Sequence, residues 1–199
     1  LARLAAHPNL MQIHDVGEED GQLYMVLPVM LGGDVEGLIE RAPDHRIPLE
    51  RAIGIARDVC QGLGFTHSAG IVHRDLKPGN LWLSGEGRTR IGGFGLAIAS
   101  GHTPAPPAGV IVGTVHYMPP EQAMGGTVTA RADLYSLGAV LYELVTGRPP
   151  FLGDDPVTVI SQHISTPPVA PTWHNPECSR SLESLILQLL AKDPPDRPD

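Results

Sequence analysis

Apolar residues recur at helical spacing in three segments of the chain. After Pro48 they follow an i, i+3, i+4 pattern, which predicts an amphipathic helix that has a proline in its first turn and ends before Gly70. Residues 133–146 are apolar on nearly every side, with Gly147 beyond them, and predict a buried central helix. A last amphipathic helix is predicted near the C-terminal end. The apolar positions of the first and last helices are Leu49, Ala52, Ile53, Ala56, Val59, Cys60 and Leu63, and Leu182, Leu185, Ile186, Leu189 and Leu190.

Shorter apolar runs have the character of β-strands. The runs MQIHDVG and QLYMVLPVM flank turn-forming residues at 18–21 and predict a β-hairpin. Two more short runs lie within residues 71–83 and 88–91. Residues 100–114 are rich in proline and glycine and predict a long loop. The pattern therefore predicts an α+β fold that is mainly helical and has a small β portion.

The composition limits what the chain can bind. Its 199 residues suit one domain, and 14 basic against 22 acidic residues give a formal net charge of −8. This charge argues against nucleic acid or an anionic membrane as the main partner. The longest apolar run, around 137–145, contains Glu143 and is too short to cross a bilayer. We expect no membrane segment here, while anchoring outside this stretch stays open.

The cysteines and histidines point to no structural cross-link. Cys60 and Cys178 lie far apart in the sequence, which favours a reducing compartment and hence a cytoplasmic location. Cys60 lies on the apolar stripe of its helix, so we expect it in the core. None of the nine histidines shows zinc-ligand spacing to another histidine or to a cysteine, so we expect no transition-metal site.

Candidate chemistry is concentrated in the segment HRDLKPGN, residues 73–80. Asp75, Lys77 and Asn80 place a carboxylate, an ammonium group and a carboxamide in one loop at i, i+2 and i+5. That combination suits phosphoryl transfer. Asp75 can accept the proton of an attacking hydroxyl, Lys77 can neutralise charge on the transferred group, and Asn80 can bind Mg²⁺ through its amide oxygen.

This segment resembles the catalytic loop of protein kinases, and its lysine two residues after the aspartate resembles the serine/threonine-specific branch. Other motifs occur in that family's order: HPNL and LYMVLPVMLGGDV before the loop, and IGGFGLA, GTVHYMPPE, DLYSLGAVLYELVTGRPPF and LLAKDPPDRP after it. The chain is identified as a member of the eukaryotic-like (Hanks-type) serine/threonine protein kinases. The resemblance implies a kinase-like α+β fold, ATP and Mg²⁺ as cofactors, and transfer of the γ-phosphoryl group to Ser or Thr of a protein substrate.

The resemblance also implies that part of the kinase domain is missing. A whole domain begins with a Gly-rich loop and a strand lysine paired to a glutamate, and the sequence contains none of the three. We expect a partial domain, in which residues 1–30 are the end of the N-lobe and the hinge, and residues 31–199 are the C-lobe, truncated before its last helix. Because the phosphate-binding lysine is missing, this stretch by itself is expected to be essentially inactive.

Gly93 departs from the family pattern. The family has an aspartate before the residues that correspond to Phe94 and Gly95, and this aspartate is its main Mg²⁺ ligand. Glycine offers no side-chain oxygen, so the rate is expected to fall by orders of magnitude. Three explanations stay open: a pseudokinase that acts as a nucleotide-binding or allosteric scaffold module, a recent single-site lesion, and a sequence error.

The resemblance assigns roles at the catalytic loop to two further residues. Thr114 would hydrogen-bond Asp75 and Lys77 and shape the site for a serine or threonine hydroxyl, although an ordinary turn threonine is the alternative. Asp133 would accept backbone N–H groups of the loop, which is a structural role.

The resemblance also implies two long-range contacts. Glu121 and Arg197 would form a buried ion pair that ties the activation segment to the lower lobe, the alternative being a solvated pair. Ile13, His73 and Phe94 would stack inside the protein, which makes His73 structural rather than a general base.

The adenine site is expected around the hinge. Leu27 falls at the gatekeeper position, Pro28 offers only a carbonyl, and Met30 can donate and accept hydrogen bonds along the hinge. Trp82 would form the floor under the base, or else belong simply to the core. Asp34 could bond the ribose, and a helix-capping role is equally consistent with its position.

Overall fold

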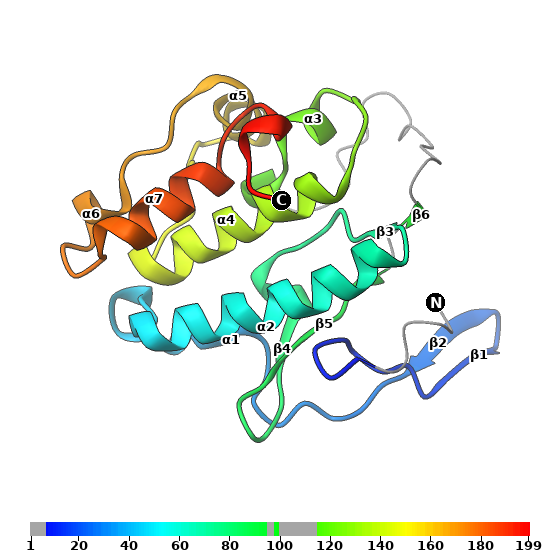
Figure 1. The fold of residues 1–199 in the computed structure, drawn as a ribbon. Coiled ribbons are helices and arrows are strands. Elements are labelled where there is room, and N and C mark those ends of the chain that lie inside the picture. The colour runs from blue at the N-terminus through cyan, green and yellow to red at the C-terminus, as the bar shows by residue number, and fades with distance from the viewer. Residues whose placement is uncertain (1–6, 95–97, 100–114) are drawn as a thin grey trace.

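The computed structural model describes residues 7–94, 98–99 and 115–199 (Figure 1). Within these ranges, helices dominate and the strands form antiparallel two-stranded sheets, β1–β2, β3–β6 and β4–β5. The strands are β1 (Asp15–Glu19), β2 (Gln22–Val26), β3 (Ile71–Val72), β4 (Leu81–Leu83), β5 (Thr89–Ile91) and β6 (Ile98–Ala99). The α-helices are α1 (Val35–Arg41), α2 (Leu49–Ser68), α3 (Pro120–Ala123), α4 (Ala130–Thr146), α5 (Pro156–Ser165), α6 (Pro171–His174) and α7 (Arg180–Leu189). Short 3-10 turns are η2 (Pro43–His45), η3 (Pro78–Asn80), η5 (Val115–Tyr117) and η6 (Pro194–Asp196).

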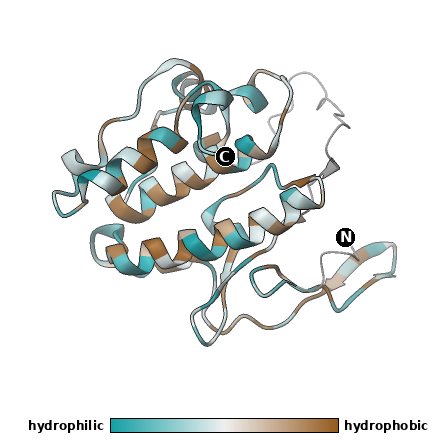
Figure 2. Cartoon of the chain, viewed as in Figure 1, coloured by the Kyte–Doolittle hydropathy of each residue, from teal (hydrophilic) through white to brown (hydrophobic). Residues whose placement is uncertain are grey.

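Helix α4 is the centre of the helical part. It packs against α2 on one side and α7 on the other, as Figure 1 shows. Most of its residues are buried, and they share one core cluster with buried apolar residues of α2 and α7. Figure 2 shows the largely hydrophobic character of α4. The helix ends at Gly147, which has a left-handed backbone. The predicted buried central helix is therefore confirmed, with its first turn beginning three residues earlier, at Ala130.

The buried face of α2 differs in part from the predicted stripe. Ala52, Val59 and Leu63 are buried as predicted. Ile55 is also fully buried, whereas Ile53 is 41% exposed and Cys60 is exposed, so the prediction that Cys60 lies in the core is wrong. The true face includes Gly62, where a Cβ would lie 2.8 Å from Ile91 of β5. Because this close approach needs a residue without a side chain, an apolar pattern alone misplaces the face by part of a turn.

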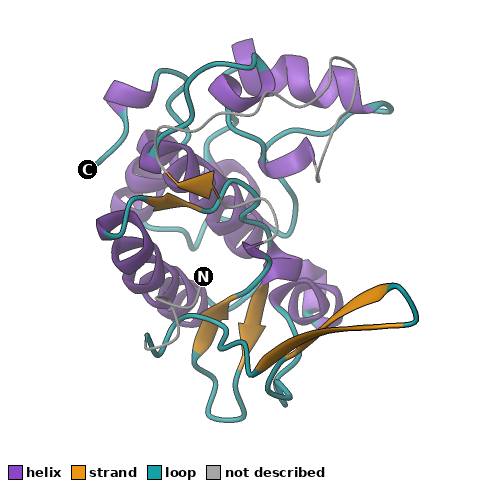
Figure 3. Cartoon of the chain, turned by 90° about the vertical axis from the view of Figure 1, so that its right-hand side faces the viewer, coloured by secondary structure: helices purple, strands orange, loops and turns teal. Residues whose placement is uncertain are grey.

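The predicted β-hairpin is confirmed and forms the edge of the molecule. Strands β1 and β2 pair in register from Asp15 with Val26 to Glu19 with Gln22. The hairpin projects away from the helices (Figure 3), and apolar side chains such as Leu23 remain largely exposed on it. The strands predicted within residues 71–83 and 88–91 also form, as β3, β4 and β5.

The last predicted helix forms as α7. Leu182, Ile186 and Leu189 are buried as predicted, while Leu185 is 44% exposed. In the part of the chain that the structure describes, no helix is both long enough and apolar enough to span a bilayer.

Glu121 of α3 and Arg197, beyond η6, form the predicted ion pair. The two Arg197 terminal nitrogens donate to Glu121 Oε1 and Oε2 at 2.7 and 2.8 Å, and both residues are buried. Arg197 also donates to the carbonyl oxygens of Arg131, Ala191 and Lys192. The pair therefore joins the segment before α4 to the segment after α7, and the alternative of a solvated pair is excluded.

Replacing Arg197 with methionine should lower the free energy of unfolding by about 3–5 kcal/mol, because the Glu121 carboxylate would stay buried without a cation. Urea unfolding followed by circular dichroism measures this loss. Asp199→Ala is the control, since Asp199 is highly exposed and pairs with Arg131 at the surface, where a pair contributes at most about 1 kcal/mol. Equal effects of the two substitutions would contradict the buried-pair assignment.

Candidate active site

A buried carboxylate at the start of α4 holds the HRDLKPGN loop. Asp133 Oδ2 accepts the His73 backbone N–H at 2.9 Å, and Oδ1 accepts that of Arg74 at 2.9 Å. His67, in the last turn of α2, adds a contact from Nε2 to Oδ2 at 2.7 Å. Arg74 has a φ of 68°, a conformation that few residues other than glycine adopt. The predicted role of Asp133 is confirmed. The contact between Asp133 and His67 was not predicted.

His73 connects this loop to the segment after β5. Its Nε2 donates to the Gly92 carbonyl oxygen at 2.7 Å, and its Nδ1 accepts the Asp75 backbone N–H at 3.3 Å. The ring meets Phe94 edge-on, with centroids 4.7 Å apart. Both ring nitrogens are thus engaged within the fold, which supports a structural role for His73. Ile13, the third residue of the predicted stack, is half-buried.

The three candidate catalytic side chains lie together at the end of the loop. Asn80 Nδ2 donates to the Asp75 backbone oxygen at 2.7 Å and to Asp75 Oδ2 at 3.1 Å. Lys77 Nζ lies 3.5 Å from the same Oδ2. The Asp75 and Lys77 side chains keep 19% and 27% of their surface exposed. A carboxylate and an ammonium group therefore face solvent side by side, where a substrate hydroxyl can reach them.

Gly93 lies directly against this cluster. Its φ is +74°, and a Cβ built there would overlap Cγ and Oδ1 of Asn80. The Asn80 amide thus occupies the space that a side chain at position 93 would need. Aspartate tolerates this backbone conformation better than most residues do, so Gly93→Asp can be accommodated if the flexible end of Asn80 rotates away.

The segment between β2 and α1 contains the residues predicted to bind adenine. Leu27 is 42% exposed, and Pro28 and Met30 are half-buried. The Met30 carbonyl accepts the Gly33 N–H at 3.0 Å, which leaves one lone pair for another donor. The binding of adenine by these three residues stays a prediction.

Asp34 and Trp82 meet where this segment passes β4. They form an isolated antiparallel bridge, and Trp82 is half-buried. Asp34 Oδ1 accepts the Gly37 N–H at 2.7 Å and caps α1. The capping role is present, while the ribose contact of Asp34 and the adenine contact of Trp82 stay predictions.

An acidic cavity of about 280 Å³ lies beside the loop, among α1, η3 and α4. Glu36, Glu40 and Glu143 line it, together with Pro78 and Tyr117. Tyr117 donates to Glu143 Oε2 at 2.6 Å. Burial raises the pKa of the Glu143 carboxyl, and the nearby Glu36 carboxylate raises it further, against the opposing effect of the Tyr117 hydrogen bond. The motifs did not predict this cavity, because its carboxylates come from separate helices.

Gln122 makes a contact with the loop that the motifs did not predict. Gln122 of α3 donates from Nε2 to the Arg74 carbonyl oxygen at 3.0 Å, so α3 as well as α4 supports the loop. Thr114 lies outside the described residues. Its proposed contacts with Asp75 and Lys77 therefore stay a prediction.

The helical lobe and its anchored polar loop define the catalytic lobe of a protein kinase. The chain belongs to the protein kinase domain family, whose model matches residues 1–199. It is 39% identical over 196 residues to the serine/threonine-protein kinase PknB of Mycobacterium leprae, covering 96% of this chain and 31% of that protein. It is 43% identical over 203 residues to the DNA damage-responsive serine/threonine-protein kinase RqkA of Deinococcus radiodurans, covering 100% of this chain and 30% of that protein. The chain thus spans about a third of the length of these relatives.

The oxygen atoms at this site do not fit the Mg²⁺ site on which protein kinases generally rely. Magnesium in such sites is held by one or two carboxylates besides the nucleotide phosphates. Position 93 supplies no oxygen from a side chain, and the Asp75 carboxylate already contacts Lys77 and Asn80. The Asn80 amide oxygen alone is neutral and packs against Gly93. Among the described residues of this site, no carboxylate therefore takes the place of the aspartate that position 93 lacks.

Proposed function

We propose that the protein carrying this chain is a serine/threonine protein kinase that transfers the γ-phosphoryl group of ATP to hydroxyl groups of a protein substrate. The observation that carries this proposal is the grouping of Asp75, Lys77 and Asn80 on a loop anchored by Asp133. Family membership and the named relatives support the same conclusion. Residues 1–30 would contribute the end of the N-lobe and the hinge, and residues 31–199 the C-lobe, with the protein acting in the cytoplasm.

Each catalytic side chain has a distinct proposed role. Asp75 accepts the proton of the attacking serine or threonine hydroxyl, and Lys77 neutralises charge on the transferred group. Asn80 holds the Asp75 backbone in place through its amide nitrogen. Thr114 would orient the hydroxyl. Leu27, Pro28, Met30, Asp34 and Trp82 would receive the nucleoside of ATP.

A second function, that of a nucleotide-binding or allosteric pseudokinase, is favoured by one observation. At Gly93 the missing carboxylate is accompanied by an Asn80 side chain that fills the space beside it. In that case the loop would serve as a scaffold and turnover would be absent. The two functions differ in what a restored carboxylate does.

Gly93→Asp in the full-length protein should raise Mg²⁺-dependent phosphorylation of a serine or threonine substrate by about a hundredfold or more, because it restores the anionic metal ligand. Transfer of radiolabelled phosphate from ATP measures the gain. Gly93→Ala is the matched control, since it adds the same Cβ against Asn80 but no oxygen.

The double variant Gly93→Asp with Asp75→Asn should lose the restored turnover and keep nucleotide binding, because it removes the base alone. If Gly93→Asp protein binds nucleotide and transfers no phosphate, the pseudokinase function is the correct one. Equal activity before and after the substitution would show that another oxygen ligand holds the metal.

The acidic cavity supports a preference for substrates with a basic residue near the phosphorylated hydroxyl. Glu36 is exposed at its rim and lies beside Gly79 of the catalytic loop. With the Gly93→Asp background, Glu36→Gln should raise KM for an arginine-containing peptide about threefold and leave KM for its alanine counterpart unchanged. Glu86→Gln, at an exposed turn elsewhere, is the control. A similar KM change for both peptides would contradict the preference.

A further inference from the structure

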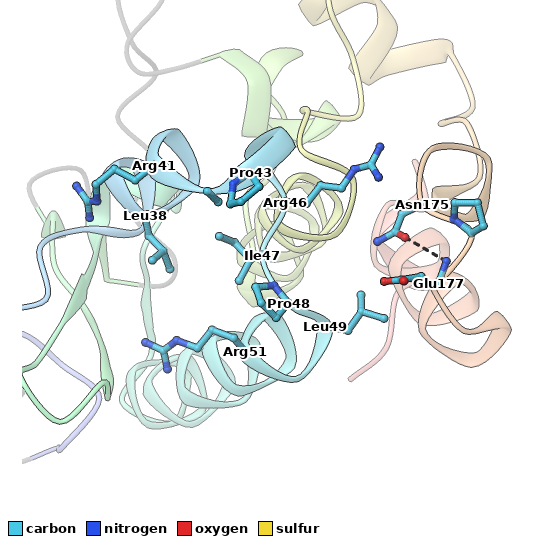
Figure 4. A pocket seen from close by; sticks show the side chains of 12 residues that line it. Leu38, Arg41, Pro43, Arg46, Ile47, Pro48, Leu49, Arg51, Asn175 and Glu177 are labelled. Carbon is cyan, nitrogen blue, oxygen red and sulfur yellow. Dashed lines mark hydrogen bonds between the residues drawn. The ribbon is translucent and has the colours of Figure 1, made fainter.

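Helix α1, which contacts η3 of the catalytic loop, lines the acidic cavity and also a second cavity of about 790 Å³. Figure 4 shows this second cavity, which lies among α1, the connection to α2 and the loop before α7. Two of its arginines are bonded elsewhere, Arg46 to the Thr146 carbonyl oxygen and Arg51 to that of Gly87. The hydrogen bonds that hold the backbone of Arg74 come instead from α3 and α4.

One peptide unit of the loop, between Arg74 and Asp75, is held at both of its polar ends. Its carbonyl oxygen accepts a hydrogen bond from Gln122 Nε2 at 3.0 Å. Its N–H donates to His73 Nδ1 at 3.3 Å. Because a peptide unit is planar, these two contacts fix its orientation, and with it the direction in which the Asp75 side chain leaves the backbone.

The backbone conformation of Arg74 makes this support necessary. Its φ of 68° is unfavourable for a residue with a Cβ and persists only where the surrounding structure holds it. Asp133 Oδ1 fixes the Arg74 N–H, and Gln122 fixes the Arg74 carbonyl oxygen. Removing the Gln122 donor would therefore free the carbonyl end of the residue while its N–H stays bound.

The side-chain amide of Gln122 directs its hydrogen bonding at the loop. Its Oε1 atom is buried and accepts no hydrogen bond from the part of the chain that the structure describes. An amide with one buried atom unpartnered adds little net stability to a fold. The preceding residue, Glu121, is held by the buried ion pair with Arg197, so α3 presents Gln122 to the loop from a fixed position.

We propose that Gln122 is a positioning residue for the catalytic base: its amide holds the Arg74–Asp75 peptide unit in the orientation that points the Asp75 carboxylate at the substrate hydroxyl. This inference rests on the proposed kinase function for the role of Asp75 as the base. Gln122 acts through Asp75 alone, and a small displacement of a base is enough to slow proton transfer. The rate of phosphoryl transfer then depends on α3 as well as on α4.

Steady-state kinetics of the full-length protein in the Gly93→Asp background test the effect on turnover. Gln122→Met keeps the length of the side chain and removes the donor. It should lower kcat about tenfold while KM for a serine-containing peptide changes less than twofold, because the base is misplaced and the peptide contacts remain. Gln188→Met is the matched control, since it makes the same change at an exposed position of α7 and should leave both constants within about twofold.

Amide hydrogen exchange at Asp75 tests the same contact without any turnover, in the protein that keeps Gly93. Gln122→Met should speed exchange of the Asp75 amide at least about threefold, because its peptide unit loses one of two fixed ends. The Arg74 amide, held by Asp133, should change less than about twofold. Gln122→Glu also removes the donor and keeps the shape of the side chain, so it takes the place of Gln122→Met if circular dichroism shows that variant to be unfolded.

Equal effects of Gln122→Met and Gln188→Met on kcat, a rise in KM with kcat unchanged, or unchanged exchange at Asp75 would overturn the proposal. If the Gly93→Asp protein transfers no phosphate, the proposed function fails. The exchange rate of the Asp75 amide then decides alone whether Gln122 positions this part of the loop, with faster exchange supporting the inference and an unchanged rate contradicting it.

Discussion

The catalytic loop depends on one buried carboxylate. Asp133 has no exposed surface, yet it accepts hydrogen bonds from two consecutive backbone N–H groups and contacts a histidine. An ionised group can remain inside a protein only when such donors replace its hydration. Asp133 belongs to the most deeply packed helix. Its hydrogen bonds therefore hold the loop rigidly against the core. The strained backbone of Arg74 and the placement of Asp75 both follow from this anchor.

The sequence predicts those parts of the fold that depend on local pattern. The central helix, the hairpin and the Asp133 contacts follow from apolar spacing or from the motif order. The face of α2 does not, because its packing depends on the close approach of β5 at Gly62, a contact between segments far apart in the sequence. Cys60 and Ile53 belong to the apolar pattern of the sequence, yet both are exposed.

The candidate site likewise has parts that the local sequence pattern predicts and parts that depend on contacts between distant segments. Asp75, Lys77 and Asn80 lie within one short loop, so their proximity follows from sequence spacing. His67 of α2 contacts Asp133, and Gln122 of α3 donates to the loop, and no local sequence pattern predicts either contact. The consequence of Gly93 is also spatial: the sequence shows the missing carboxylate, and the structure adds that Asn80 occupies the space beside it. Restoring the ligand therefore requires a rearrangement of Asn80 as well as a new oxygen.

Amide hydrogen exchange at His73 and Arg74 tests the anchoring role of Asp133 most directly. Both amides should exchange slowly in the unmodified protein, as buried amides of α4 such as that of Leu141 do. Asp133→Asn offers one acceptor oxygen in place of two, so exchange at His73 or Arg74 should become at least about tenfold faster while Leu141 is unchanged. Rapid exchange of both loop amides before the substitution, or unchanged rates after it, would contradict the account.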